Sequence, residues 1–227
     1  MELTAICNAG VLLNHAGTGL LIDGISRDHA GFSGLDDGIY GDILQKNGIF
    51  SGLSGLFFTH CHPDHFDALR VQHAREMFPS CRFFTPDEEP DAVGTVQCGP
   101  FSVSWYETEH LPYKDAQVRH AVFLIKTENC AIYILADAIP DAEVHRKILN
   151  GIKPDVIFVN PMHLSNPAMR EFLHELIPKH IYTYHIPTDS EDRTGMRRKT
   201  IRTAARDYQK TVPITLITEF PMYLGEV

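Results

Sequence analysis

The residues best suited to do chemistry in this sequence lie between positions 59 and 67. This stretch holds three histidines and two aspartates, and four of these five residues form the pattern H-x-H-x-D-H: His60, His62, Asp64 and His65. Imidazole nitrogens together with a carboxylate oxygen suit zinc, manganese or iron better than calcium, which prefers oxygen ligands alone. The pattern therefore predicts a site for a divalent metal ion.

The local chain geometry allows for two ions rather than one. In an extended segment alternate side chains share a side, so His60 and His62 can bind the same ion. Pro63 turns the chain after them, and Asp64 and His65 can then face a second ion. The alternative is an exposed histidine-rich loop. A tract of that kind would not show this order directly after an apolar run, so we favour the metal site.

The composition bounds the class of protein. With 227 residues, 44% hydrophobic and 22% charged, the chain fits one globular domain spanning residues 1–227. A formal net charge of -9 argues against nucleic acid and anionic membranes as partners, and no apolar run has the length of a membrane span. Five scattered cysteines without a C-x-x-C spacing favour reduced thiols and a cytoplasmic location. The expected partner is a small-molecule substrate, and a homo-oligomer stays open.

Apolar periodicity and turn residues predict a mixture of strands and helices. Turns at 99–100 and 128–129 indicate antiparallel pairing of the strands between 95 and 136. Strands come first and are later mixed with helices, which predicts an α+β layered sandwich with the helices outside. We expect short strands before residue 24, strands at 53–59, 81–84, 95–98, 101–108, 118–127, 131–136, 156–160, 181–184 and 212–218, and helices at 66–78, 141–150, 168–177 and 195–210.

Between residues 24 and 52 the chain is rich in Gly, Asp and Ser, with helical turns expected only at 42–47. Loops of this length in compact domains are often lids or binding loops. Phe32 and Tyr40 are therefore candidate substrate contacts. The alternative is that these two rings pin the loop to the core.

Other polar side chains directly follow expected strands. His110, Asp137 and His185 each stand at such a strand end, and a sheet whose strand ends converge on one edge would bring them to the H-x-H-x-D-H motif. Asp23 ends an apolar strand before a glycine, where it either supports a site or caps the turn. His120, which begins a strand, is an alternative to His110 as a ligand.

The order of these residues resembles the five ordered motifs of the metallo-β-lactamase-fold hydrolases. The resemblance spans Asp23 to His185 and implies a four-layer αββα sandwich with two metal ions, zinc favoured and Mn²⁺ or Fe²⁺ as alternatives, at the edge between the sheets. The bridging residue it implies is Asp137, and Asp23 would support the site. The implied ligands are His60, His62 and His110 for the first ion and Asp64, His65 and His185 for the second.

Some details of the sequence narrow the branch of that superfamily. The compact chain, the turn at 8–10 and the segment 59–67 look most like the ascorbate-6-phosphate lactonase-like branch. His62 stands where the di-iron oxygen-reductase branch usually has glutamate, and Asp137 stands in place of the cysteine that true β-lactamases use. Ala136-Asp137-Ala138 departs from that branch's usual Gly-Asp-Thr, so Asp137 is assigned by position and context.

Several residues near the motifs have two readings. His163 follows a buried strand and either lines the pocket or has only a loop role. Arg193 and Arg197, in the loop after His185, are candidate contacts to an anionic substrate. Asp67 either orients a ligand histidine through its second ring nitrogen or caps a helix.

Basic residues recur every four positions on the last expected helix, at Arg198, Arg202 and Arg206. A solvated helix face is the favoured interpretation, and an anchor for phosphate or carboxylate is the alternative. The histidines without supporting context are expected to be exposed; they are His15, His29, His73, His145, His174 and His180.

Two cations held by Asp137 would trap a bridging water and lower its pKa toward neutrality. The predicted function is hydrolysis, in which this hydroxide attacks the carbonyl of a lactone or ester, with phosphorylated or carboxylated small molecules among the candidate substrates. Asp64 and Asp137 are the candidate catalytic residues. Two alternatives stay open: a phosphodiesterase on the same dinuclear site, and a non-hydrolytic di-iron redox protein.

Overall fold

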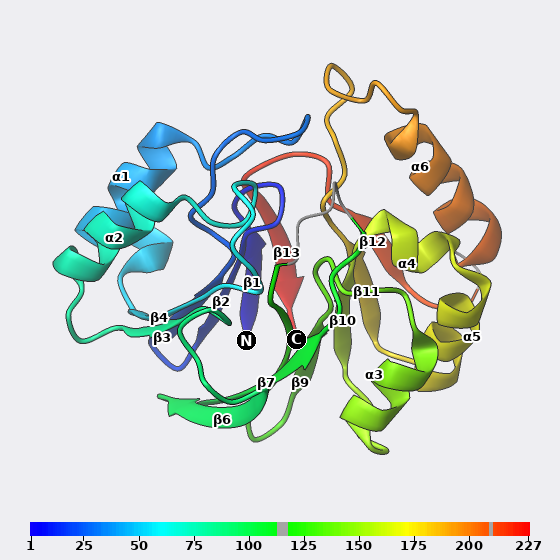
Figure 1. Ribbon diagram of the computed structural model, residues 1–227, viewed down its shortest axis with the longest axis horizontal. Helices are drawn as coiled ribbons and strands as arrows, with labels where there is room; N and C mark the ends of the chain where they lie inside the picture. The colour runs from blue at the N-terminus through cyan, green and yellow to red at the C-terminus, as the bar shows by residue number, and fades with distance from the viewer. Residues whose placement is uncertain (113–117, 209–210) are drawn as a thin grey trace.

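Two β-sheets pack face to face and carry helices on their outer faces (Figure 1). The computed structural model describes residues 1–112, 118–208 and 211–227. Helices α1 and α2 lie on one side of the sandwich, and helices α3 to α6 lie on the other (Figure 1). The predicted α+β, four-layer αββα sandwich is confirmed.

The first sheet has six strands and the second has seven. In spatial order the first sheet consists of β13 (Met222–Glu226), β1 (Glu2–Ala5), β2 (Val11–His15), β3 (Thr18–Ile22), β4 (Leu53–Phe57) and β5 (Arg82–Phe84). The second consists of β12 (Ile214–Leu216), β11 (His180–Thr183), β10 (Val156–Val159), β9 (Ala131–Ile134), β8 (His120–Lys126), β7 (Phe101–Thr108) and β6 (Val93–Cys98).

Parallel and antiparallel pairing divide each sheet. Strands β3, β4 and β5 run parallel, as do β9, β10, β11 and β12. The expected antiparallel pairing between residues 95 and 136 is confirmed, because β6, β7, β8 and β9 form an antiparallel meander. The carboxyl ends of parallel strands meet at one edge of a sheet, which is where loops form ligand sites in such folds.

Three apolar clusters separate the four layers. The central cluster fills the space between the sheets and includes Phe57, Phe123 and Phe158. A second cluster, with Phe172, lies under helices of the second sheet, and a third, with Val71, lies under α1 and α2. Strands β8, β9 and β10 are buried on both faces, which explains their nearly unbroken apolar sequences.

The helices lie close to their expected positions, with two exceptions. They are α1 (Asp37–Gln45), α2 (Ala68–Met77), α3 (Ala142–Leu149), α4 (Pro161–Ser165), α5 (Pro167–Leu176) and α6 (Met196–Asp207), with a 3₁₀ turn at Gly48–Phe50. Helix α1 begins five residues before the expected turns at 42–47, and α4 was not expected. Within the described residues no helix is long and apolar enough to cross a membrane.

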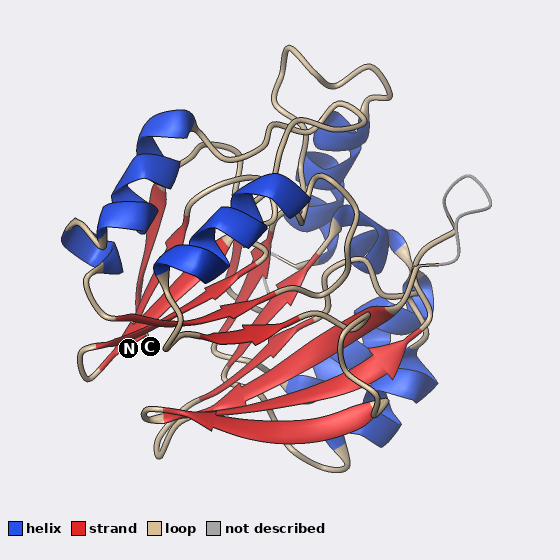
Figure 2. Cartoon of the chain, turned by 60° about the vertical axis from the view of Figure 1, so that its left-hand side comes forward, coloured by secondary structure: helices blue, strands red, loops and turns tan. Residues whose placement is uncertain are grey.

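Strand β13 was also not expected. It pairs with β1, so the two ends of the chain lie side by side (Figure 2). The backbone nitrogen of Met1 donates to the carbonyl of Val227, and the nitrogen of Val227 donates to the carbonyl of Met1, both at 2.9 Å. The alternation of apolar and polar residues in β13 is weak, because β13 is an edge strand that is only partly buried.

Candidate metal centre

Polar residues from both sheets meet where their strands end. Each follows its strand by one to three residues, on the same edge of the sandwich. They are Asp23 after β3, His60 after β4, His110 after β7, Asp137 after β9, Asn160 after β10 and His185 after β11. The two β-sheets thus deliver side chains from opposite halves of the sequence to one place.

Two of these residues leave their strands with a left-handed backbone. Asp23 has φ 49° and His185 has φ 56°, values that non-glycine residues rarely adopt. Backbone hydrogen bonds hold both turns: the nitrogen of Asp23 donates to the carbonyl of Phe57 at 2.9 Å, and that of His185 donates to Asn8 at 3.0 Å. Strain of this kind persists where the surroundings over-determine the conformation, and it is concentrated at functional sites.

The side chains form two groups with metal-ligand chemistry. Three imidazoles, those of His60, His62 and His110, bring ligand atoms to within 4.8 Å of one another. Asp64, His65 and His185 form a second group within the same distance. The first group is partly open to solvent, whereas all three members of the second group are buried.

Asp137 lies between the two groups. Its Oδ2 atom is 3.8 Å from Nε2 of His110 in the first group, and 3.6 Å from Nε2 of both His65 and His185 in the second. The other oxygen, Oδ1, accepts a hydrogen bond of 3.0 Å from Nδ2 of Asn160. Asn160 therefore turns one carboxylate oxygen away and leaves the other facing both groups.

Hydrogen bonds at Nδ1 fix the orientation of the histidines. His65 donates from Nδ1 to Oδ2 of Asp23 at 3.0 Å. The hydroxyl of Thr59 donates to the same oxygen at 2.7 Å. Because its proton is used there, the Thr59 oxygen accepts from Nδ1 of His60 at 3.1 Å. His110 donates from Nδ1 to the carbonyl of Leu111. In its neutral form with the proton on Nδ1, each ring presents the lone pair of Nε2, which is the atom that a metal would bind.

The Nε2 atoms themselves make no hydrogen bond to the described protein residues. Those of His60, His65, His110 and His185 are buried and accept or donate no hydrogen bond within the described residues. Leaving buried polar atoms unsatisfied costs roughly 1–3 kcal/mol each. Several such atoms converging on two carboxylates fit bound cations, so the residues present match the donor set that zinc, manganese or iron prefers.

The protein environment shifts the pKa values of these groups in opposite directions. Burial lowers the pKa of His60 well below its ordinary value, which keeps its imidazole neutral. Burial acts on His65 in the same sense, but the carboxylates of Asp23 and Asp137 outweigh it and raise the pKa of His65 well above its ordinary value. Burial would raise the pKa of Asp137, yet the imidazoles of His185 and His65 hold it well below its usual range.

A cavity of about 400 Å³ opens over the two groups. Its floor includes His62, Asp64 and Asp137, and its walls include Phe32 and Met162. This volume falls in the range of small-molecule sites, which combine apolar walls with a few convergent polar groups.

Three of the expected substrate contacts, His163, Arg193 and Arg197, do not line this cavity. His163 is fully buried, and its Nδ1 atom accepts from the backbone nitrogen of Asn160 at 3.3 Å, which completes the N-terminal cap of α4. Arg197 pairs with Asp189 at 2.9 Å, and Arg193 is exposed outside the cavity wall. The role of these three residues as substrate contacts thus finds no support in their positions.

Phe32 and Tyr40, two aromatic residues of the 24–52 segment, have different roles. The ring of Phe32 lies edge-on to the ring of His185, with centroids 4.1 Å apart, and lines the cavity. Tyr40 lies outside the cavity lining and donates from its hydroxyl to the carbonyl of Arg70 at 2.9 Å. Phe32 is thus a candidate substrate contact, whereas Tyr40 pins α1 to α2.

The contacts of Asp67 and His120 decide whether Asp67 orients a ligand histidine and whether His120 replaces His110 as a ligand. Asp67 caps α2, accepting from the backbone nitrogens of Leu69 at 3.0 Å and Arg70 at 3.2 Å. The residue that orients ligand imidazoles is Asp23. His120 is fully buried beside His60, with ring centroids 5.2 Å apart, but it belongs to neither group of ligand atoms.

Asn160 is the site residue that the sequence analysis missed. It caps α4, accepting from the nitrogen of Met162 at 2.9 Å while its amide holds the carbonyl of Ala136 and the carboxylate of Asp137. An asparagine before a proline after a buried apolar run is the signature of a helix start. That signal identifies the cap but says nothing of the amide's second contact.

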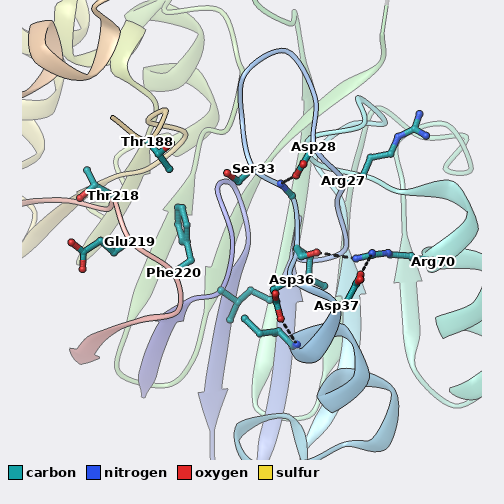
Figure 3. A pocket seen from close by; sticks show the side chains of 14 residues that line it. Arg27, Asp28, Ser33, Asp36, Asp37, Arg70, Thr188, Thr218, Glu219 and Phe220 are labelled. Atoms are coloured by element: carbon teal, nitrogen blue, oxygen red, sulfur yellow. Dashed lines mark hydrogen bonds and ion pairs between the residues drawn. The ribbon is translucent and has the colours of Figure 1, made fainter. Parts of the chain in front are cut away.

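A second, larger hollow of about 910 Å³ lies between the loop after β3 and the segment before β13 (Figure 3). Several of its charged groups are already engaged: Arg70 pairs with Asp37, and Asp36 caps α1. None of the residues in the two groups lines it. We therefore place the chemistry at the smaller cavity.

No protein-family model matches this sequence, and no curated protein matches it. Solved structures do match. A metal-dependent hydrolase candidate from Veillonella parvula superposes with a TM-score of 0.64 at 14% identity, over 99% of this chain and 98% of that one. The fold is of the metallo-β-lactamase type. An isothiocyanate hydrolase from Delia radicum gut bacteria gives a TM-score of 0.62 at 18% identity, over 100% and 99% of the two chains.

A third match is CmlA, a diiron β-hydroxylase from Streptomyces venezuelae, with a TM-score of 0.64 at 16% identity. It covers 98% of this chain but 53% of CmlA, so this chain spans about half the length of that protein. Identities this low establish a shared fold alone, and the proteins that share it include an isothiocyanate hydrolase and a diiron β-hydroxylase.

Proposed function

We propose that this chain is a metal-dependent hydrolase that holds two divalent cations and acts on the carbonyl group of a lactone or ester. The observation that carries the proposal is Asp137, whose Oδ2 atom faces both groups at 3.6–3.8 Å. His60, His62 and His110 would hold one ion, and Asp64, His65 and His185 the other, with zinc favoured over manganese and iron. The low-identity match to two hydrolases of this fold supports the reaction class.

When bound, such cations polarise a substrate oxygen and lower the pKa of water toward neutrality. The chain's own residues supply position and proton transfer. Asn160 holds Oδ1 of Asp137, so Oδ2 is the oxygen available to take a proton and pass it to a leaving group. Asp64 lies on the cavity floor with Oδ2 at 3.3 Å from Nε2 of His185, and it is the second candidate for proton transfer.

The walls of the cavity also contribute. Phe32 covers His185, and Met162 and Met196 form an apolar side of the cavity. Apolar walls exclude water and strengthen the electrostatic interactions of the carboxylates. They also suit a substrate with an apolar segment next to the reacting carbonyl.

Metal analysis and a substrate panel test this proposal. We expect about two transition-metal ions per chain after reconstitution, and hydrolysis of lactones or aryl esters. Asp137→Asn keeps the side-chain shape but weakens the bridging charge, so kcat/KM falls on the order of 10³-fold. Asp91→Asn, at an exposed aspartate, is the matched control and leaves kcat/KM unchanged. Less than one bound ion per chain would refute the dinuclear site.

The same metal analysis and substrate panel also test two alternative functions. Faster turnover of an aryl phosphodiester than of any lactone or ester would favour a phosphodiesterase. The match to a diiron hydroxylase makes a redox protein the remaining candidate. It predicts selective iron loading and oxygen consumption without turnover of any ester.

A further inference from the structure

Helix α6 packs against α4 (Figure 1), and three neighbouring hollows follow α6, beginning at the cavity lined by Asp64 and Asp137. A hollow of about 190 Å³ shares Met162 and Met196 with the cavity. The next hollow, of about 340 Å³, shares Ser165, Lys199 and Thr203 with it. The three spaces therefore lie in a row along α6, from the cavity lined by His62, Asp64 and Asp137 to the hollow lined by Arg206, and we call this row the groove.

The far part of the groove is basic. Lys199, Arg202 and Arg206 line the last hollow, and no carboxylate is among the described residues that line either of the two outer hollows. Arg206 pairs with Asp207, whereas Lys199 and Arg202 have no carboxylate partner in the described part of the chain. Unpaired cations in one groove of a chain with a formal net charge of -9 favour an anionic ligand there.

Helix geometry gives the spacing of this groove. Met196 is at the cavity and Arg202 follows it by six residues on α6, so the two lie about 9 Å apart along the axis at 1.5 Å per residue. That distance is the length of about three extended amino-acid residues. Arg198, on the same helix, lines none of the three spaces.

We propose that the substrate is an extended molecule with a phosphate or carboxylate group remote from the reacting carbonyl. Lys199 and Arg202 bind this anionic group, the apolar segment crosses Met162 and Met196, and the carbonyl lies over Asp137. The assignment of the reacting group rests on the proposed hydrolase function. The anion-binding role of Lys199 and Arg202 rests on the lining of the groove and does not depend on the hydrolase function.

Esters of graded length and charge test this anchor with the metal-loaded protein. The probes are the mono-p-nitrophenyl ester of sebacic acid, which has a remote carboxylate, p-nitrophenyl decanoate of equal length without one, and the short mono-p-nitrophenyl succinate. In the double variant Lys199→Ala/Arg202→Ala, we expect kcat/KM for the sebacate ester to fall about five- to tenfold through KM, as two exposed ion pairs allow. The decanoate and succinate esters are unaffected, and Arg198→Ala changes none of the three.

Added salt weakens the preference for the sebacate ester in the wild type but not in the double variant, because exposed charges are screened. Equal kcat/KM of wild type and double variant on the sebacate ester would overturn the anchor while leaving the hydrolase intact. Calorimetric binding of octyl phosphate separates the two proposals and extends the test to phosphate. If no ester is hydrolysed but octyl phosphate binds at least fivefold more weakly to the double variant, the hydrolase fails and the anchor stands. Equal binding overturns the anchor.

Discussion

Two kinds of buried histidine occupy this protein, and their hydrogen bonds differ. At the metal edge, Nδ1 of His60 and His65 donates to the protein and Nε2 has no partner in the described residues. His145, on the buried face of α3, is equally buried, but both of its nitrogens are used. Its Nε2 lies 3.4 Å from the carbonyl of Ile139 and Nδ1 lies 2.8 Å from the hydroxyl of Tyr133.

The comparison shows that burial alone does not identify a ligand. The carbonyl of Ile139 can only accept, so the proton of His145 is on Nε2 and its Nδ1 accepts from Tyr133. The imidazoles at the edge carry the proton on the opposite nitrogen, which leaves Nε2 as a lone pair. His145 therefore stabilises the core, and the expectation that it would be exposed was wrong.

The largest predicted difference between a histidine at the metal edge and His145 is the effect of its substitution on kcat/KM. His60→Ala should remove bound metal and lower kcat/KM on the order of 10³-fold, because it removes a ligand of the first group. His145→Ala should leave metal content and kcat/KM within about threefold, while lowering the free energy of unfolding by about 2–4 kcal/mol. Metal analysis, kinetics and denaturant titration measure these effects. Equal metal loss in both variants would contradict the comparison.

A smaller effect, on stability, depends on pH. Burial lowers the pKa of His145 to about 4 in the folded chain, below the ordinary value of 6.5. Unfolding then takes up a proton between these values, so this contribution to stability is complete above pH 6.5 and is lost as the pH falls toward 4. At about 1.4 kcal/mol per pH unit over this window, the loss is limited to about 3.5 kcal/mol.

Denaturant titrations of metal-free wild type and His145→Gln between pH 7 and pH 4 isolate this contribution. Other buried histidines, such as His120, titrate in the same sense in both proteins, so the difference between the two curves reports His145. We expect the stability of the glutamine variant to fall less steeply with decreasing pH. Parallel curves would show that His145 does not titrate in this window.

How much of this arrangement the sequence predicts depends on the range of the interactions. The H-x-H-x-D-H motif and the strand-end positions of His110, Asp137 and His185 are local patterns, and the structure brings these residues together. The position of Phe32 over His185 joins residues more than 150 positions apart, and so does the pairing of β13 with β1. Such contacts leave no periodic signal, since they depend on how the sheets pack.

Asp23 and Asp67 illustrate the same limit, because both were candidates for supporting the ligand histidines. The structure gives this role to Asp23, through His65 and Thr59, and leaves Asp67 as the cap of α2. Asp23→Asn should weaken metal affinity about 10–100-fold, as expected when a partner of a ligating histidine is changed.

Asp67→Ala serves as the matched control for this last prediction. It should leave metal affinity unchanged and lower the free energy of unfolding by about 1 kcal/mol, the usual cost of a lost helix cap. Competition with a metal chelator measures affinity, and denaturant titration of the metal-free proteins measures stability. A loss of affinity in Asp67→Ala as large as that in Asp23→Asn would mean that the start of α2, rather than the Asp23 carboxylate, sets the orientation of the ligands.

Asp23 reaches both groups of ligands, because the hydroxyl of Thr59 donates to Asp23 and accepts from His60. Its substitution should therefore weaken both ions together, whereas a defect confined to the second group would show that the contact through Thr59 is dispensable.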